Sequence, residues 1–221
     1  MYFDAHIHIT DIDSLKFAQK KGVESFIINA TNPNDWMNIL DIQIKIPNVY
    51  PTIGVHPWFI QNLSSNWLEK MENLLKQNQT LMIGEIGLDY SKKHQEQQLD
   101  ILKKQLNLAQ KYNRPVHIHT VKSWHIILQI IKQYPHLRYL FHKCNASCDI
   151  IQKLSKYDAY FSIDNPKNLS LFPIEKLLVE TDSPHHGRSP VDIITFVQKI
   201  NISPQQLYKN FQNFINYNKG I

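Results

Sequence analysis

The chain has 221 residues, of which 43% are hydrophobic and 19% charged, and its formal net charge is +5. This balance indicates a globular protein that favours anionic partners, and the length suits one α/β domain. No apolar run approaches the roughly 20 residues that cross a bilayer, no secretion signal is recognised, and two cysteines make no disulfide framework, so we expect a cytoplasmic protein.

Short apolar segments alternate with amphipathic segments along the whole chain. The predicted strands are Tyr2–His8, Glu24–Ala30, Val49–Gly54, Leu81–Ile86, Val116–His119, Leu137–His142, Ala159–Ile163 and Leu177–Thr181. The predicted helices are Ser14–Lys21, Asp35–Lys45, Asn66–Gln77, Gln95–Asn113, Trp124–Lys132, Ala146–Lys156, Leu169–Lys176, Pro190–Ile200 and Pro204–Asn218. Eight such repeats predict a compact (β/α)8 TIM barrel formed by the single domain 1–221, with an open doubly wound sheet as the alternative.

The first predicted strand carries a histidine pair in the run Phe3-Asp4-Ala5-His6-Ile7-His8. Side chains two residues apart in a strand point to the same face, so His6 and His8 project together. Neutral imidazoles suit Zn²⁺ and other transition metals. The pair therefore predicts two ligands of one metal site, with Asp4 supporting the histidines from behind.

Further ligand-type residues follow the ends of later predicted strands. Glu85 lies between two glycines, where a carboxylate can bridge two ions. His119 lies nearer its strand end than His117, so His119 is the favoured ligand and His117 a packing or supporting residue. Asp182 follows a strand that reads as buried, where an acid is costly unless it is paired or bound to metal. In a barrel, active-site groups occupy the carboxyl ends of the strands.

Four imidazoles and two carboxylates are enough for two divalent ions, such as Zn²⁺, Mg²⁺ or Mn²⁺. The expected metal ligands are His6, His8, Glu85, His119, His142 and Asp182. Glu85 would be shared, and Asp182 would also accept a proton from the attacking water. Two ions can activate water and hold both oxygens of a displacement, so the expected chemistry is hydrolysis of a phosphoester, amide or lactone.

Loops at the same end of the predicted barrel supply groups for a substrate. The residues expected to face a phosphate are His56, Lys143, His185 and Arg188. Trp58, Phe59 and Trp67 follow His56. Packing is the favoured interpretation of these aromatic residues, and stacking on a base is the alternative.

Taken in order, these motifs resemble the TatD family of metal-dependent deoxyribonucleases. The resemblance rests on Asp4-Ala5-His6-Ile7-His8, Gly54-Val55-His56-Pro57, Gly84-Glu85-Ile86-Gly87-Leu88-Asp89, Pro115-Val116-His117-Ile118-His119, His142 and Glu180-Thr181-Asp182-Ser183-Pro184. It implies a TIM barrel of the amidohydrolase-like kind with a two-metal site. It also implies that the six ligands above are the family's ligands, that Asp182 is the general base, and that the substrate is DNA.

The chain departs from the family pattern on the substrate side. Val121 stands where the family usually has arginine, Lys143 and Cys144 interrupt the motif after His142, and the segment His185–Pro190 is short. The alternatives are therefore an amidohydrolase-type enzyme for a small amide, lactone or phosphoester, and a non-catalytic metal-binding or nucleic-acid-binding protein. No obligate protein partner is inferred.

Overall fold

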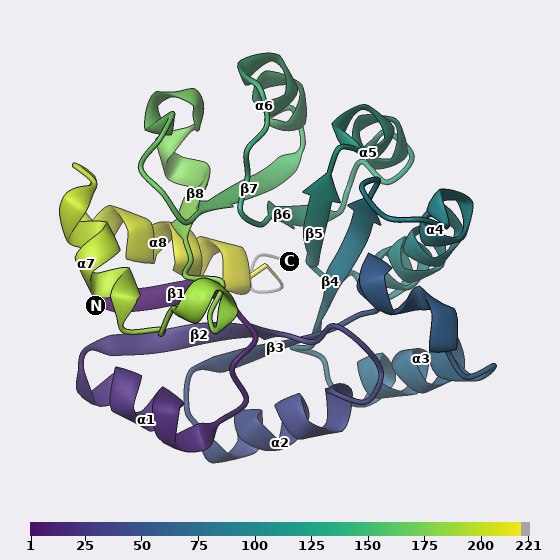
Figure 1. The fold of residues 1–221 in the computed structure, drawn as a ribbon, viewed down its shortest axis with the longest axis horizontal. Helices are drawn as coiled ribbons and strands as arrows, with labels where there is room; N and C mark the ends of the chain where they lie inside the picture. The colour runs from purple at the N-terminus through teal and green to yellow at the C-terminus, as the bar shows by residue number, and fades with distance from the viewer. Residues whose placement is uncertain (218–221) are drawn as a thin grey trace.

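Eight parallel strands follow one another around a ring in the computed structural model, which describes residues 1–217 (Figure 1). The strands are β1 (Tyr2–Ile7), β2 (Val23–Asn29), β3 (Val49–Ile53), β4 (Met82–Asp89), β5 (Val116–Val121), β6 (Arg138–Phe141), β7 (Asp158–Ile163) and β8 (Leu177–Val179). Their spatial order is the chain order, so the prediction of a TIM barrel is confirmed and the open doubly wound sheet was wrong.

The ring closes between its first strand and the segment after its last strand. The backbone N–H of His8 donates to the carbonyl of Ser183 at 2.7 Å, and that of Asp182 donates to the carbonyl of His6 at 3.0 Å. The carboxylate of Asp4 accepts from the backbone N–H of Thr181 at 2.9 Å. Predicted metal ligands from the two ends of the sheet are thus brought together at this seam.

Helices cover the outside of the strand ring in Figure 1. The α-helices are α1 (Ile12–Lys20), α2 (Trp36–Lys45), α3 (Trp67–Gln77), α4 (Gln95–Tyr112), α5 (Trp124–Ile131), α6 (Cys148–Leu154), α7 (Asp192–Lys199) and α8 (Pro204–Ile215). The 3₁₀ turns are η1 (Pro57–Asn62), η2 (Leu169–Leu171), η3 (Ile174–Lys176) and η4 (His185–Gly187). Each barrel strand contributes apolar side chains to one continuous core.

Several helix predictions differ from the structure for local reasons. The predicted helix Leu169–Lys176 is two 3₁₀ turns, because Pro173 lies between them and proline lacks the N–H that a helix would use. The first helix begins at Ile12 rather than Ser14, because Asp11 caps it by accepting from the N–H of Ser14. The predicted end of the last helix, Asn218, lies outside the described residues.

The last helix blocks one end of the barrel. Phe211 of α8 stacks on Phe3 with ring centroids 4.5 Å apart, and Phe214 packs edge-on against Tyr160 and His117. His117 is fully buried, so Phe214 contacts the barrel interior. Access to the interior is therefore from the opposite end, where the strands finish. Within residues 1–217, no helix is long and apolar enough to span a membrane.

Candidate metal centre

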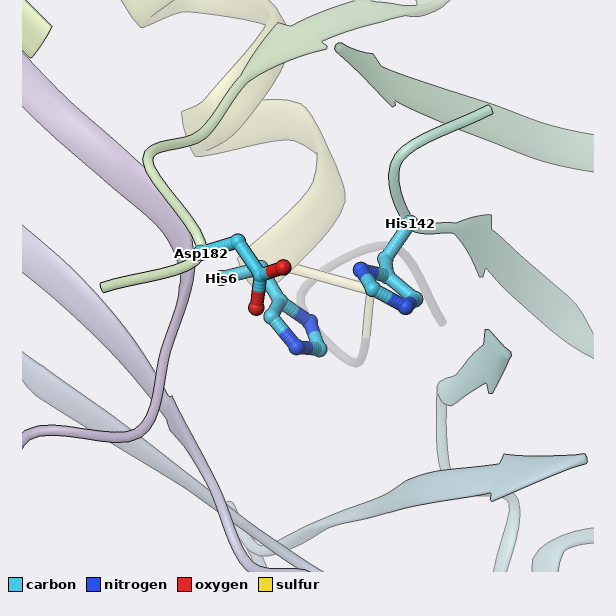
Figure 2. Close-up of side chains that lie close together, drawn as sticks. All are labelled: His6, His142 and Asp182. Carbon is cyan, nitrogen blue, oxygen red and sulfur yellow. The ribbon is translucent and has the colours of Figure 1, made fainter. Parts of the chain in front are cut away.

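The predicted ligands converge where the strands end. Figure 2 shows the side chains of His6, His142 and Asp182 directed into one space from three separate segments. One ligand atom from each of these residues lies within 4.8 Å of the others, and the same holds for the group of His6, His8 and Glu85. Residues far apart in the sequence are thus combined into one cluster with little exposure to solvent.

Glu85 lies between two histidine pairs and turns one carboxylate oxygen toward each. Its Oε2 lies 3.4 Å from His6 Nε2 and 3.3 Å from His8 Nε2. Its Oε1 lies 2.9 Å from both His119 Nδ1 and His142 Nε2. This is the arrangement that a bridging carboxylate requires.

The outer hydrogen bonds of two histidines leave their inner nitrogens free for a metal. His8 Nδ1 lies 2.9 Å from the carbonyl of Asn29, and His142 Nδ1 lies 3.2 Å from Glu180 Oε1. Because both partners are acceptors, each Nδ1 carries a proton, which leaves Nε2 as the nitrogen of each ring that can bind a metal.

His56 has the opposite arrangement, although its Nε2 lies only 3.6 Å from Glu85 Oε1. Its Nδ1 accepts from the backbone N–H of Trp58 at 3.2 Å. Burial lowers the pKa of His56 to about 3, so the ring is neutral and the proton is on Nε2. His56 is therefore suited to donate a hydrogen bond at the site rather than to bind a metal.

The residues fit a divalent cation. His6 Nε2 and His8 Nε2 lie 3.1 Å apart, and His119 Nδ1 lies 3.1 Å from His142 Nε2. Among the described residues the buried Glu85 Oε1 has no hydrogen-bond partner, although two ring nitrogens approach it. Lone pairs that crowd together in a buried space are stabilised when a cation lies among them.

Burial and neighbouring charges shift the cluster's ionisation. Burial opposes ionisation of Glu85, but the neighbouring His142 holds its pKa well below the usual range. Burial also opposes protonation of His142, but Glu85 and Glu180 raise its pKa well above the usual range. Burial, aided by His142, lowers the pKa of His6. A metal ion bound to this cluster of histidines and carboxylates would displace a proton from it.

The glycines beside Glu85 allow its strand to approach β5 closely. A Cβ on Gly84 would lie 2.5 Å from the Cβ of His117, and one on Gly87 would lie 2.0 Å from the carbonyl oxygen of His119. Gly87 also has a φ of +151°. Larger residues would push Glu85 away from the histidines of β5.

A cavity of about 780 Å³ opens over the cluster and receives three of the four predicted substrate groups: His56, Lys143 and His185. Lys143 Nζ lies 3.0 Å from Asp182 Oδ2. Burial lowers the pKa of Lys143, but the contact with Asp182 outweighs this effect and raises the pKa, so Lys143 is a cation. Arg188 is directed elsewhere: it donates to Asp164 at 2.8 Å and to the carbonyl of Thr181 at 3.1 Å.

The sequence did not reveal several supporting groups. The backbone carbonyl of Asn29 orients His8, the carboxylate of Glu180 orients His142, and the hydroxyl of Ser162 donates to Glu180. A polar residue within or just beyond a buried strand was the only signal for Ser162 and Glu180, and a backbone carbonyl such as that of Asn29 has none. The support expected from Asp4 takes another form, because its carboxylate accepts from the backbone N–H of His6 at 3.3 Å and binds Thr181 rather than an imidazole ring.

A TIM barrel with a histidine and carboxylate cluster at the carboxyl ends of its strands defines the class, a metal-dependent hydrolase. A family model described as TatD related DNase matches residues 3–209. The chain therefore belongs to the TatD-related DNase family, and the predicted family is confirmed.

Individual relatives agree with this assignment. The chain is 28% identical over 200 residues to an uncharacterized metal-dependent hydrolase of Methanocaldococcus jannaschii, covering 83% of this chain and 79% of the relative. It is 24% identical over 216 residues to human deoxyribonuclease TATDN3, covering 83% and 78%. The crystal structure of the TatD homolog YjjV from Escherichia coli has the same fold, with a TM-score of 0.87, 22% identity, and coverage of 97% and 98%.

Proposed function

We propose that this protein is a phosphodiesterase that hydrolyses DNA with two divalent metal ions. The observation that carries the proposal is Glu85, whose two oxygens each face a different histidine pair. One ion would be held by His6, His8, Asp182 and Glu85 Oε2, and the other by His119, His142 and Glu85 Oε1. Relatives named deoxyribonucleases in human and in Schizosaccharomyces pombe support DNA as the substrate.

The residues around the ions have separate roles. Bound divalent ions such as Zn²⁺, Mg²⁺ or Mn²⁺ would lower the pKa of a water molecule and neutralise phosphate charge. Asp182 would accept the proton of the attacking water. Lys143 and the Nε2 proton of His56 would hold the phosphate oxygens, with His185 at the cavity wall. Arg188 stays a weaker candidate, because its guanidinium binds Asp164.

The principal test is turnover of single-stranded DNA by protein loaded with Mn²⁺, Mg²⁺ or Zn²⁺. We expect nucleotide release by the wild type and a decrease of roughly 10²–10⁴-fold in Asp182→Asn, because the proton acceptor is lost. Asp149→Asn, which changes an exposed carboxylate on α6, is the matched control. Equal DNA cleavage by the wild type and Asp182→Asn would contradict the proposed role of Asp182, and no cleavage by the wild type would contradict the nuclease.

Metal content separates the ligands from the substrate groups. We expect two equivalents in the wild type, a loss of one equivalent in His119→Ala, and two equivalents in His56→Ala, measured by elemental analysis after dialysis. The reason is the tautomer of His56, whose Nε2 carries a proton. His56→Ala should lower only turnover. A metal deficit in His56→Ala would place His56 among the ligands.

The cytoplasmic location is also a prediction. It rests on the use of cysteine, since Cys144 and Cys148 are both free thiols. No obligate protein partner is proposed.

A further inference from the structure

Trp58 forms the boundary between two hollows of the surface. On one side lies the cavity over the metal centre, which Trp58 and Phe59 both line. On the other side lies a smaller hollow of about 250 Å³, which Trp58 also lines. The remaining residues of this second hollow are Pro57, Ile60, Gln61, Lys92, Lys93 and His94. The side chain of Trp58 is 51% exposed and that of Phe59 is 43% exposed, so neither belongs to the core.

The indole of Trp58 is held in place although half of it is exposed. Its ring nitrogen donates to Asp89 Oδ2 at 2.6 Å, and its backbone N–H donates to His56. The ring meets that of His56 edge-on, with centroids 5.1 Å apart. A large aromatic side chain fixed in this way can bind a flat ligand without losing much conformational freedom.

The turn that carries the lysines of the second hollow is fixed by the same carboxylate. Asp89 Oδ1 accepts from the backbone N–H of Ser91 at 2.9 Å, and the buried Gln98 donates to the carbonyl of Lys93 at 3.0 Å. Lys92 Nζ lies over the Trp58 ring, 5.0 Å from its centre, and Lys92 lines the second hollow but not the cavity over the metal centre. Among the described residues, neither Lys92 nor Lys93 has an ion-pair partner, so both charges are available to an anion.

We infer that Trp58 and the Lys92–Lys93 hollow form a second subsite for the substrate strand. An unpaired base stacks on the face of the indole that lines the cavity over the metal centre, opposite Lys92, and the phosphate beyond that base lies against the two lysines. Base stacking on an aromatic ring combined with lysine contacts to phosphate is the chemistry of single-strand recognition. The inference rests on the proposed phosphodiesterase and specifies its substrate as an oligonucleotide with unpaired bases rather than a small phosphate ester.

Binding tests the subsite without turnover. Asp182→Asn protein is titrated against a fluorescent eight-nucleotide DNA strand, and anisotropy gives the Kd. Adding Trp58→Ala should raise the Kd by roughly tenfold or more, while Trp58→Phe, which keeps a ring, should lose less. Phe17→Ala removes an equally exposed aromatic from α1, where Phe17 is 53% exposed, and serves as the matched control. An unchanged Kd in Trp58→Ala would overturn the inference.

The lysines are tested by salt dependence. Replacing Lys92 and Lys93 by alanine should reduce the slope of log Kd against log salt by about 0.7, the value for one phosphate contact on a single strand. Lys103→Ala together with Lys104→Ala, on α4, is the matched double control. An unchanged slope would show that Lys92 and Lys93 do not contact a phosphate of the strand.

A comparison of two substrates separates this subsite from the proposed function. With the oligonucleotide and with methyl p-nitrophenyl phosphate, Trp58→Ala should raise KM for the oligonucleotide by a larger factor than for the small diester. Equal losses on both substrates would mean that Trp58 acts only by positioning Asp89, whose Oδ2 lies 3.9 Å from Nε2 of the proposed ligand His119. If the wild type cleaves neither substrate but binds DNA through Trp58, the subsite stands and the proposed hydrolysis fails.

Discussion

Histidines around the cluster acquire different roles through the hydrogen-bond partner of the ring nitrogen that points away from the cluster. His8 and His142 each donate outward from Nδ1 to an acceptor, which leaves Nε2 as the nitrogen that faces the cluster. His56 accepts from a backbone N–H and therefore presents a proton to the same space. The sequence shows three histidines near strand ends, but the hydrogen-bond partners distinguish two candidate ligands from one candidate hydrogen-bond donor.

Glu180 is the residue on which this distinction depends for His142. Glu180→Gln keeps the shape of the side chain but removes the charge that holds the proton on His142 Nδ1. We expect the metal affinity to fall by roughly 10–100-fold, measured by competition with a chelator of known affinity. Glu175→Gln, an exposed carboxylate on η3, should leave it unchanged. Wild-type affinity in Glu180→Gln would show that His142 needs no such partner.

At the scale of elements, a cation joins two strands to the last helix. Arg138 at the start of β6 donates from Nε to Asp158 of β7 at 2.6 Å. Its Nη1 donates to the carbonyl of Asn213 at 2.6 Å, close to the end of α8. Because helix carbonyls near the C-terminus lack internal partners, this contact fixes α8 beneath the barrel.

This junction predicts a pH dependence of stability. Burial raises the pKa of Asp158, but Lys176 and Arg138 outweigh this effect and lower the pKa in the folded state. Its stabilising contribution is therefore complete above the unfolded pKa of about 4 and is lost as the pH falls through the lower folded pKa. Asp158→Asn should cost about 1 kcal/mol at pH 7, since solvent screens the pair, and the difference from wild type should shrink below about pH 4. Urea unfolding at pH 7 and pH 3.5 measures this, and a difference independent of pH would contradict it.

At the scale of the whole molecule, the proposed metal centre lies on the seam that closes the barrel. His6 and Asp182 share a backbone hydrogen bond across the seam and also contribute to the ligand cluster. A metal ion bound there would therefore connect the first and last strands as well as supply chemistry. Ligands that bind only the folded state stabilise it by mass action.

Chelation should consequently lower the melting temperature of the entire domain. At a metal concentration of 100 Kd the linkage is worth about 2.7 kcal/mol, which corresponds to roughly 5–11 °C for a chain of this size. Differential scanning fluorimetry with and without EDTA measures the shift. The double variant His6→Ala, His8→Ala should show a smaller response to EDTA at the same metal concentration, because it keeps only the ion proposed at His119 and His142. A response equal to that of the wild type would place the stabilising ion elsewhere.

The sequence predicted the barrel and its eight strands well, because apolar runs are local patterns, but β4 continues to Asp89 and β5 to Val121, past the predicted ends at Ile86 and His119. Asn29, Ser162 and Glu180 were missed since their roles depend on partners that are distant in the chain. Arg188 was expected at the substrate, but Asp164, 24 residues away in sequence, binds its guanidinium. Such pairings have no sequence signal until the fold places the residues side by side.

The closure of the barrel between His6 and Asp182 also bears on biosynthesis. Asp182 is translated 176 residues after His6. Until Asp182 has been made, the strands of a nascent chain cannot close into a ring at this seam. Contacts of such long sequence separation form late in folding. Metal uptake at full affinity would therefore be deferred until Asp182 has left the ribosome, and a nascent chain that ends before Asp182 would lack part of the ligand cluster.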